Sequence, residues 1–315
     1  MSQASRRTVT LSNMVERRKL MGGMFDWITG GVGRLRDFAY SGPSRKSFMP
    51  RVGLALSGGF ARGIAHIGVL RVLKEHNFPI DVIAGTSVGA LIGAAFASGT
   101  TIDEMERQAK ITKFTDFGRW TLSRLGLASN QKLEEFLGRY ATAKRFEDLR
   151  IPMTIAATDL GAGNTVYFTK GDLGTAVRAS CAYPGLFVPV HLNGRILVDG
   201  FLTEPVPVEG ARRAGADIVI AVNLSSRTVE VQPKSMFEVI GRAFSIVQQT
   251  SDFTWRRNAD VVIEPQVMQF LWDEFNRTPE LIAAGESAAR LALPAIRTAI
   301  ASFNRAEAAA ALTAN

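Results

Sequence analysis

The stretch "DVIAGTSVGALIGAAFASG", Asp81–Gly99, decides how this chain folds. From Val82 to Ile102 the sequence carries no charged residue, and about 20 apolar residues suffice for a transmembrane helix. A membrane span is disfavoured because four glycines and several hydroxyl residues replace a dense run of Leu, Ile and Phe. Two interpretations remain: an inert buried strand and helix, or a strand that turns sharply into a helix and presents Ser87.

The second interpretation rests on the pattern G-x-S-x-G. Gly85-Thr86-Ser87-Val88-Gly89 fits it, with a β-rich run before and a helix-forming run after. Gly85 and Gly89 are the small residues that such a tight elbow requires, because neighbouring segments approach closely there. The dipole of the following helix favours negative charge near Ser87. The pattern therefore predicts Ser87 as a nucleophile.

Apolar runs of strand length alternate with helical periodicity along the rest of the chain. The expected strands are residues 51–57, 81–85, 151–160, 164–171, 194–200, 216–224 and 259–265, and the expected helices are residues 63–77, 90–97, 103–110, 130–141, 171–181, 206–215, 235–257 and 278–303. This alternation is typical of an α/β fold, with a mostly parallel sheet covered by helices on both faces.

A serine nucleophile needs a base, and the three histidines fit that role poorly. In the α/β-hydrolase order the histidine follows the acid, but the last histidine, His191, precedes the best late acid, Asp199. His66 lies on an apolar helix face, where packing explains its presence. His76 lies near the end of that helix, where a cation suits the helix dipole. Asp199 follows a buried strand and precedes Gly200, so it either caps the turn or acts on Ser87 as the base.

A glycine-rich segment separates the first expected strand from the first helix. It comprises Gly58, Gly59, Phe60, Ala61, Arg62 and Gly63. Backbone N–H groups of such a loop can hold an anion. A nucleotide loop is disfavoured because no Lys-Ser/Thr pair follows and Phe60 interrupts G-x-G-x-x-G. The segment is therefore predicted to form an oxyanion hole. No cluster of His, Cys and carboxylate residues suggests a metal, and no cofactor is expected.

Taken together and in this order, the three motifs resemble the patatin-like phospholipase family over roughly residues 51–300. The resemblance implies a three-layer α/β/α fold and hydrolysis of lipid acyl esters. It makes Ser87 the nucleophile, Asp199 of the Asp-Gly motif its base in a Ser–Asp dyad, and Gly58–Gly63 the oxyanion hole. The segments "ATDLGAG", "RASCAYPGLFVPV" and "FNRTPELIAAGESAA" also look like blocks of its bacterial members.

Two residues depart from the family pattern and bear on the shape of the acyl pocket. Phe60 stands where the third glycine of the loop is usual, and Phe201 follows Asp199-Gly200 where glycine or alanine is usual. Four further residues in or near the family blocks are interpreted as structural. They are Asp159, Asp172, Ser180 and Cys181.

Composition and charge divide the chain into three parts. With 46% apolar and 21% charged residues, its 315 residues can bury a large core. The predicted parts are a basic, partly amphipathic extension over residues 1–50, a hydrolase domain over 51–303 and an Ala-rich tail over 304–315. The single cysteine excludes an intramolecular disulfide framework, and with no signal peptide in view a cytoplasmic location is expected.

Residues 1–51 contain ten basic against three acidic residues, which accounts for nearly all of the net charge of +8. Such a leader attracts polyanions. Its mixture of Met, Phe, Trp and Ile with Arg and Lys is typical of interfacial helices, so an anionic membrane surface is a candidate partner. Nucleic-acid binding would rest on charge alone and is disfavoured.

The expected function is a serine acyl hydrolase of the phospholipase A, lysophospholipase or esterase type, acting on a lipid or other acyl ester through an acyl-enzyme. Two alternatives stay open. One is a regulatory or binding protein that keeps the fold, and the other is an acyltransferase or thioesterase. The sequence leaves the head group, the acyl length and the oligomeric state open.

Overall fold

The computed structural model describes residues 49–225, 232–233 and 236–313. The chain divides into two compact units, Met1–Ser44 and Arg45–Asn315, and the described residues all belong to the second. The predicted basic extension therefore lies outside the described residues, except for its last two.

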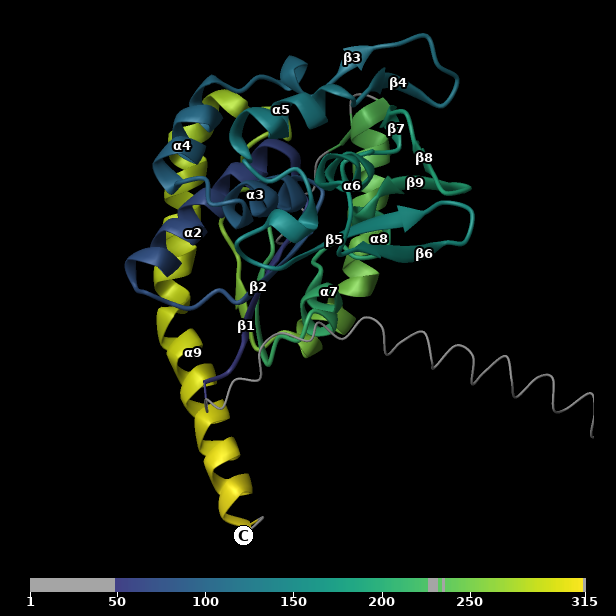
Figure 1. The fold of residues 1–315 in the computed structure, drawn as a ribbon. Coiled ribbons are helices and arrows are strands. Elements are labelled where there is room, and N and C mark those ends of the chain that lie inside the picture. Colours follow the sequence, from purple (N-terminus) through teal and green to yellow (C-terminus); the bar gives the residue numbers. More distant parts are fainter. Residues whose placement is uncertain (1–48, 226–231, 234–235, 314–315) are drawn as a thin grey trace, which may run out of the picture. The chain divides into compact units, whose positions relative to one another are not determined.

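An eight-stranded sheet forms the centre of the second unit (Figure 1). Its order is β11-β10-β1-β2-β5-β9-β8, and β6 pairs with β5 off this path. The parallel strands are β1 (Val52–Leu56), β2 (Val82–Thr86), β5 (Met153–Asp159), β10 (Ile218–Val222) and β11 (Val261–Ile263). The strands paired antiparallel to their neighbours are β6 (Asn164–Phe168), β8 (Val190–Leu192) and β9 (Arg195–Asp199).

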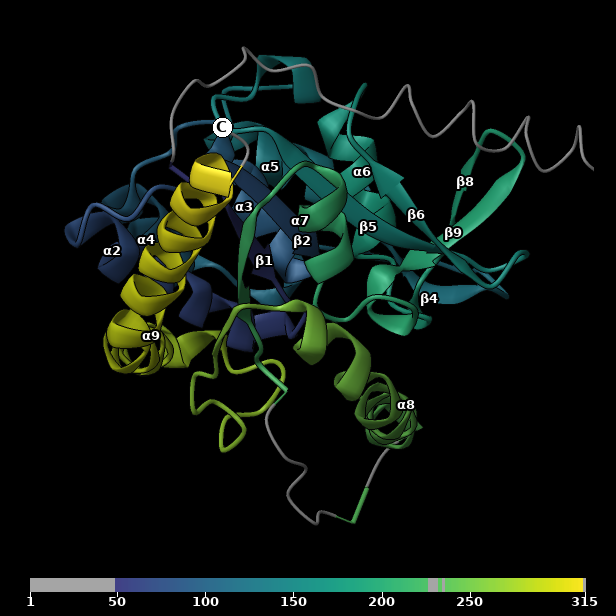
Figure 2. The same ribbon diagram turned by 90° about the horizontal axis from the view of Figure 1, so that it is seen from below.

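Helices cover both faces of the sheet, as Figure 2 shows from below. One face carries α2 (Ala65–Glu75), α3 (Val88–Ala97), α4 (Ile102–Ile111), α5 (Lys132–Tyr140), α6 (Leu173–Ser180) and α9 (Thr278–Thr313), and the other carries α7 (Val208–Arg213) and α8 (Met236–Asn258). The prediction of a three-layer α/β/α fold with a mostly parallel sheet is thereby confirmed.

The alternation of side chains along β1 separates these two layers. Leu54 and Leu56 join the larger buried cluster with α2, α3 and α9, whereas Ala55 joins the smaller cluster with α7. Successive side chains of a strand point to opposite faces. On the face with the small side chains, α7 and the turn after it lie very close to β1, since a Cβ on Gly53 would lie 2.6 Å from Ala216 Cβ.

The uncharged stretch from Val82 to Ile102 is not a membrane span. It forms β2 and α3, which are buried in the core. Within the part of the chain that the structure describes, no helix combines the length and apolarity needed to cross a bilayer.

Three details differ from the expected elements. Neither strand β8 nor a second sheet of β3 (Arg119–Trp120), β4 (Gly126–Ser129) and β7 (Gly185–Phe187) was predicted, because such short strands show no clear period. Helix α9 continues through most of the predicted tail, to Thr313. Asp199 is itself the last residue of β9, rather than a residue that follows the strand.

Candidate active site

The site forms where two strands end on the same edge of β5. The β2 strand pairs parallel with β5 up to Thr86↔Ala156, and β9 pairs antiparallel with β5 up to Asp199↔Ala157. Because β6 takes the other edge, β2 and β9 approach each other end to end. This register places Ser87, which follows Thr86, beside Asp199.

Ser87 sits in a strained turn between β2 and α3. Its φ of 54° and ψ of −124° are rare for a residue with a side chain. The flanking glycines allow the close approach: a Cβ on Gly85 would lie 2.6 Å from Ala90 Cα, and one on Gly89 would lie 2.2 Å from Leu56 O. The backbone therefore turns sharply from β2 into α3 at Ser87, between two closely packed glycines.

Ser87 and Asp199 are joined by a direct hydrogen bond. Ser87 Oγ donates to Asp199 Oδ2 at 2.7 Å, while Asp199 Oδ1 accepts the backbone N–H of Phe201 at 2.9 Å. Asp199 therefore caps the turn and also accepts a hydrogen bond from Ser87, and its role as the base stays a prediction. Burial raises the pKa of Asp199 to about 7, although its two hydrogen bonds act in the opposite direction. Such a carboxyl group can gain or lose a proton near neutral pH.

Ser180, at the end of α6, fixes the backbone of the elbow. Its Oγ accepts the N–H of Ser87 at 2.8 Å and donates to the carbonyl of Ala156 at 2.6 Å. The structural role of Ser180 is thus to position the backbone of Ser87. No local sequence pattern predicts this contact. Asp172 caps α6 through the N–H of Thr175, so its side chain serves the local fold.

His66 and His191 have other surroundings than the Ser87 hydroxyl. His66 Nε2 lies 2.9 Å from the carbonyl oxygen of Ser57, and burial lowers the pKa of the ring to about 4. His191 is an exposed residue of β8. Within the described residues, the hydrogen bond of the Ser87 hydroxyl goes to Asp199 and none runs to a histidine.

The predicted oxyanion segment is partly a 3-10 turn, Phe60–Ile64. Two of its N–H groups donate hydrogen bonds to carbonyl groups of distant segments. Gly58 N donates to Pro205 O at 3.3 Å, and Ala61 N donates to Trp272 O at 3.0 Å. Gly59 and Phe60 precede the first internally bonded N–H of the turn, and within the described residues their N–H groups have no hydrogen-bond partner.

Arg62 ties this loop to the segment that leads into α9. Its Nε and Nη2 donate to the carbonyl of Phe270 at 3.0 and 2.8 Å. Burial lowers the pKa of its guanidinium, and the charge of Glu274 opposes this. The Arg62 side chain therefore holds the loop in place.

The two phenylalanines that depart from the family pattern both lie at the site. Phe60 has a φ of 51°, the left-handed conformation that glycine adopts without strain. Its ring makes edge contacts with Tyr183 and Trp272, at centroid distances of 5.0 and 5.3 Å. Phe201 fills the space beside the loop, since a Cβ on Gly58 would lie 2.7 Å from its ring.

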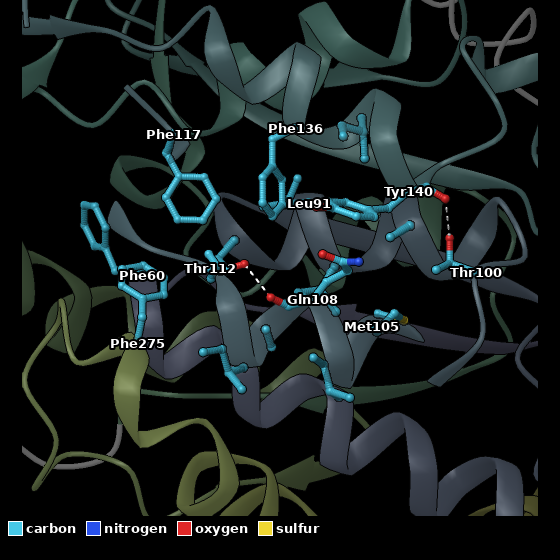
Figure 3. Close-up of a pocket in the computed structure, with 17 residues that line it drawn as sticks. Phe60, Leu91, Thr100, Met105, Gln108, Thr112, Phe117, Phe136, Tyr140 and Phe275 are labelled. Atoms are coloured by element: carbon cyan, nitrogen blue, oxygen red, sulfur yellow. Dashed lines mark hydrogen bonds between the residues drawn. The ribbon is translucent and has the colours of Figure 1, made fainter. Parts of the chain in front are cut away.

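Two adjoining apolar pockets lie beside the elbow, and Ser87 lines one of them. The first, of about 420 Å³, is lined by Ser87, Cys181 and a set of apolar side chains. The second, of about 610 Å³, extends between α3, α4 and α5. The residues that line both pockets are Phe60, Val88, Leu91, Phe117 and Phe275. In Figure 3, Phe60, Phe117 and Phe275 lie at one end of the larger pocket, and Thr100 and Tyr140 lie at the other.

Cys181, for which the sequence predicts a structural role, lies in the wall of the first pocket next to the serine. Burial and the charge of Asp199 raise the pKa of its thiol, and a hydrogen bond with Ser87 acts against this shift. A raised pKa keeps the thiol protonated and weakly reactive at neutral pH. Its place in the pocket could not be foreseen, because it depends on how α6 ends against the elbow.

These features define an α/β protein with a serine–aspartate pair on a strand-to-helix elbow. A family model described as patatin-like phospholipase matches residues 54–212, just over half of the chain. The matched range contains both Ser87 and Asp199. The chain belongs to the patatin-like phospholipase family.

Several curated proteins are similar to part of this chain. An NTE family protein of Mycobacterium tuberculosis is 40% identical over 184 residues, which cover 58% of this chain and 51% of that protein. The lysophospholipase nte1 of Aspergillus fumigatus is 30% identical over 181 residues, 56% of this chain and 12% of the fungal protein. The chain thus spans about half the length of the mycobacterial relative. Among solved structures, VipD from Legionella pneumophila aligns over 78% of this chain and 66% of its own, with 11% identity and a TM-score of 0.46.

Proposed function

We propose that this protein is a serine acyl hydrolase that cleaves ester-linked acyl chains from lipids, with Ser87 as the nucleophile and Asp199 as its base. The observation that carries the proposal is the 2.7 Å hydrogen bond from Ser87 Oγ to Asp199 Oδ2 at the wall of an apolar pocket. A carboxylate is a weak base for a serine, but a pKa of about 7 brings Asp199 close to the operating pH. The lysophospholipase name of the fungal relative agrees with a lipid ester as the substrate.

The reaction begins with proton transfer from Ser87 Oγ to Asp199 Oδ2 as Oγ attacks the ester carbonyl carbon. The N–H groups of Gly59 and Phe60 then stabilise the negative charge on the carbonyl oxygen. As the carbon–oxygen bond of the ester breaks, Asp199 gives its proton to the leaving alcohol, and the acyl group remains on Ser87. A water molecule, deprotonated by Asp199, attacks this acyl-enzyme, and the proton returns to Ser87 as the fatty acid leaves.

The acyl chain would occupy the apolar pockets. Phe60, Val88 and Leu91 line both of them, so a chain attached at Ser87 can extend from the first pocket into the second. Each methylene that leaves water gains about 0.8 kcal/mol, which favours acyl chains over short acids.

Labelling with a fluorophosphonate probe tests the nucleophile and its base. The wild-type protein should label strongly, Ser87→Ala not at all, and Asp199→Asn much more slowly. The matched control is Ser98→Ala, which removes another buried hydroxyl that bonds a backbone carbonyl. Labelling that survives in Ser87→Ala, or a folded wild-type protein that does not label, would overturn the proposal.

Product analysis separates the hydrolase from its alternatives. Phospholipid, lysophospholipid and neutral glyceride are each supplied with and without an added alcohol acceptor. Free fatty acid that is released equally in both conditions supports hydrolysis. An ester of the added alcohol as the main product would instead show an acyltransferase.

A further inference from the structure

We propose that the β3–β4 hairpin, Arg119–Ser129, is a docking element for an anionic lipid bilayer. The hairpin carries four exposed apolar side chains, two in its turn and two on its strands. Their exposed fractions are 69% for Trp120, 109% for Leu122, 59% for Leu125 and 37% for Leu127. Figure 1 shows the hairpin at the end of the domain where β7 lies. A cluster of large apolar side chains on a protruding turn favours transfer out of water.

The charge of the hairpin selects the kind of partner. Arg119 and Arg124 are exposed, and from Phe117 to Leu133 the chain contains no carboxylate. Tryptophan prefers the headgroup region of a bilayer, and arginine side chains reach phosphates from beside apolar neighbours. This combination of exposed apolar and basic side chains complements a negatively charged lipid surface.

The base of the hairpin adjoins the wall of the pocket at Ser87. The residue Phe114, just before the hairpin, stacks on Phe187 with ring centroids 6.4 Å apart, and both line the pocket. Within the small sheet, Ala128 of β4 pairs with Phe187 of β7. Leu122 follows Phe117 of that wall by five residues, so the two lie at most roughly 18 Å apart along the chain. A hairpin held in the headgroup layer would therefore keep the pocket close to the bilayer.

This inference goes beyond the proposed hydrolase activity, because bilayer binding needs no turnover. The full-length Ser87→Ala protein is sedimented with vesicles of phosphatidylcholine alone, or of phosphatidylcholine mixed with phosphatidylglycerol. All variants keep residues 1–48, so any binding by the basic extension is common to them. The apolar variant combines Trp120→Ala with Leu122→Ser. Its matched control is Leu291→Ser, which removes a leucine that is 81% exposed on α9.

The apolar variant should bind the mixed vesicles roughly tenfold more weakly, while the control binds like the parent. The charge variant, Arg119→Gln with Arg124→Gln, should lose affinity for the mixed vesicles only, and the loss should shrink at high salt. It keeps the apolar side chains, so it separates loss of docking from misfolding. In the active background, all variants should cleave a soluble short-chain ester like the wild-type protein.

Three outcomes would overturn the proposal. The first is a parent protein that does not sediment with either vesicle, and the second is an apolar variant that binds as well as the control. The third is a change in the sedimentation coefficient of the free protein without a change in vesicle binding, which would make the hairpin an interface between copies. A failed hydrolase assay leaves the vesicle result intact, so the two proposals fail separately.

Discussion

Ser180 bonds the backbone of Ser87: its Oγ accepts the Ser87 N–H at 2.8 Å and donates to Ala156 O at 2.6 Å. The φ of 54° at Ser87 is a conformation that costs about 1–3 kcal/mol. A buried hydrogen bond to that same peptide unit offsets part of this strain. Ser180 is thus a positioning residue for the elbow.

The Ser180→Ala variant should lose turnover through a misplaced Ser87 Oγ. We expect kcat to fall about tenfold or more with little change in KM, and the free energy of unfolding to fall by about 1–3 kcal/mol, because a buried donor and a buried acceptor lose their partner. Steady-state kinetics and chemical denaturation measure the two effects. The control, Ser98→Ala, removes a hydroxyl that bonds Ala94 O at 2.8 Å on α3. Equal kcat values in the two variants would contradict the positioning role.

The pH dependence of turnover should follow Asp199. Burial raises its pKa to about 7 in the folded protein, and only the ionised carboxylate can take the proton of Ser87. We therefore expect kcat/KM for a soluble ester to rise with pH through about 7 and then level off. Asp199→Asn should be nearly inactive, with no such rise. A wild-type profile that is flat from about pH 5 to about pH 8 would contradict Asp199 as the base.

The free energy of unfolding should fall as pH rises, in the direction opposite to turnover. Glu204 is a second buried carboxyl group whose pKa burial raises to about 7, against 4.5 ordinarily. Between about pH 4 and pH 7 the folded protein binds more protons than the unfolded chain, so stability falls as pH rises, by at most about 1.4 kcal/mol per pH unit for each group. Denaturation across this window should show a shallower slope for Glu204→Gln. The control is Glu135→Gln, an exposed residue of α5 that is not among the groups acting on the pKa of Glu204, so the slope should stay as in the wild-type protein.

Most of the fold can be predicted from local sequence patterns. The strand and helix around Ser87 follow from G-x-S-x-G and its apolar flanks, since an elbow is built from adjacent residues. The partnership with Asp199 is a matter of register: β9 must end at Ala157, one residue past the point where β2 ends. Apolar patterning marks a strand but does not fix which edge it joins or where it stops, so the resemblance to a family was needed to select Asp199.

The remaining features depend on packing between distant segments. Nothing near Gly58 or Ala61 shows that their N–H groups bond to Pro205 and Trp272, which lie far along the chain. The apolar pocket between α3, α4 and α5 likewise arises only when three helices meet. Short strands such as β3 escape periodicity because two residues define no pattern.

Phe60 offers a direct test of stored backbone strain. At a φ of 51° an alanine carries the full penalty of about 1–2 kcal/mol, whereas glycine carries almost none. Both Phe60→Gly and Phe60→Ala remove the ring contacts with Tyr183 and Trp272, so their difference isolates the backbone. We expect Phe60→Gly to be the more stable of the two by about 1 kcal/mol in chemical denaturation.

Phe117 provides the matched pair, because it lines the same pockets at a φ of −97°. There the usual preference should hold, with Phe117→Ala more stable than Phe117→Gly. If alanine is also preferred at position 60, the left-handed conformation of Phe60 carries no strain in solution.

The far end of the larger pocket should set the longest acyl chain that the enzyme accepts. Figure 3 shows Met105 and Tyr140 at the end away from Phe60. Met105→Trp fills that end, so turnover of long-chain esters should fall at least tenfold while short-chain esters are cleaved as before. Overpacking should lower the free energy of unfolding by about 1–3 kcal/mol. Met105→Leu conserves volume and should keep the wild-type profile over a series of p-nitrophenyl esters. A parallel loss for short and long esters in Met105→Trp would show that the acyl chain lies elsewhere, because filling the far end cannot obstruct a chain too short to reach it.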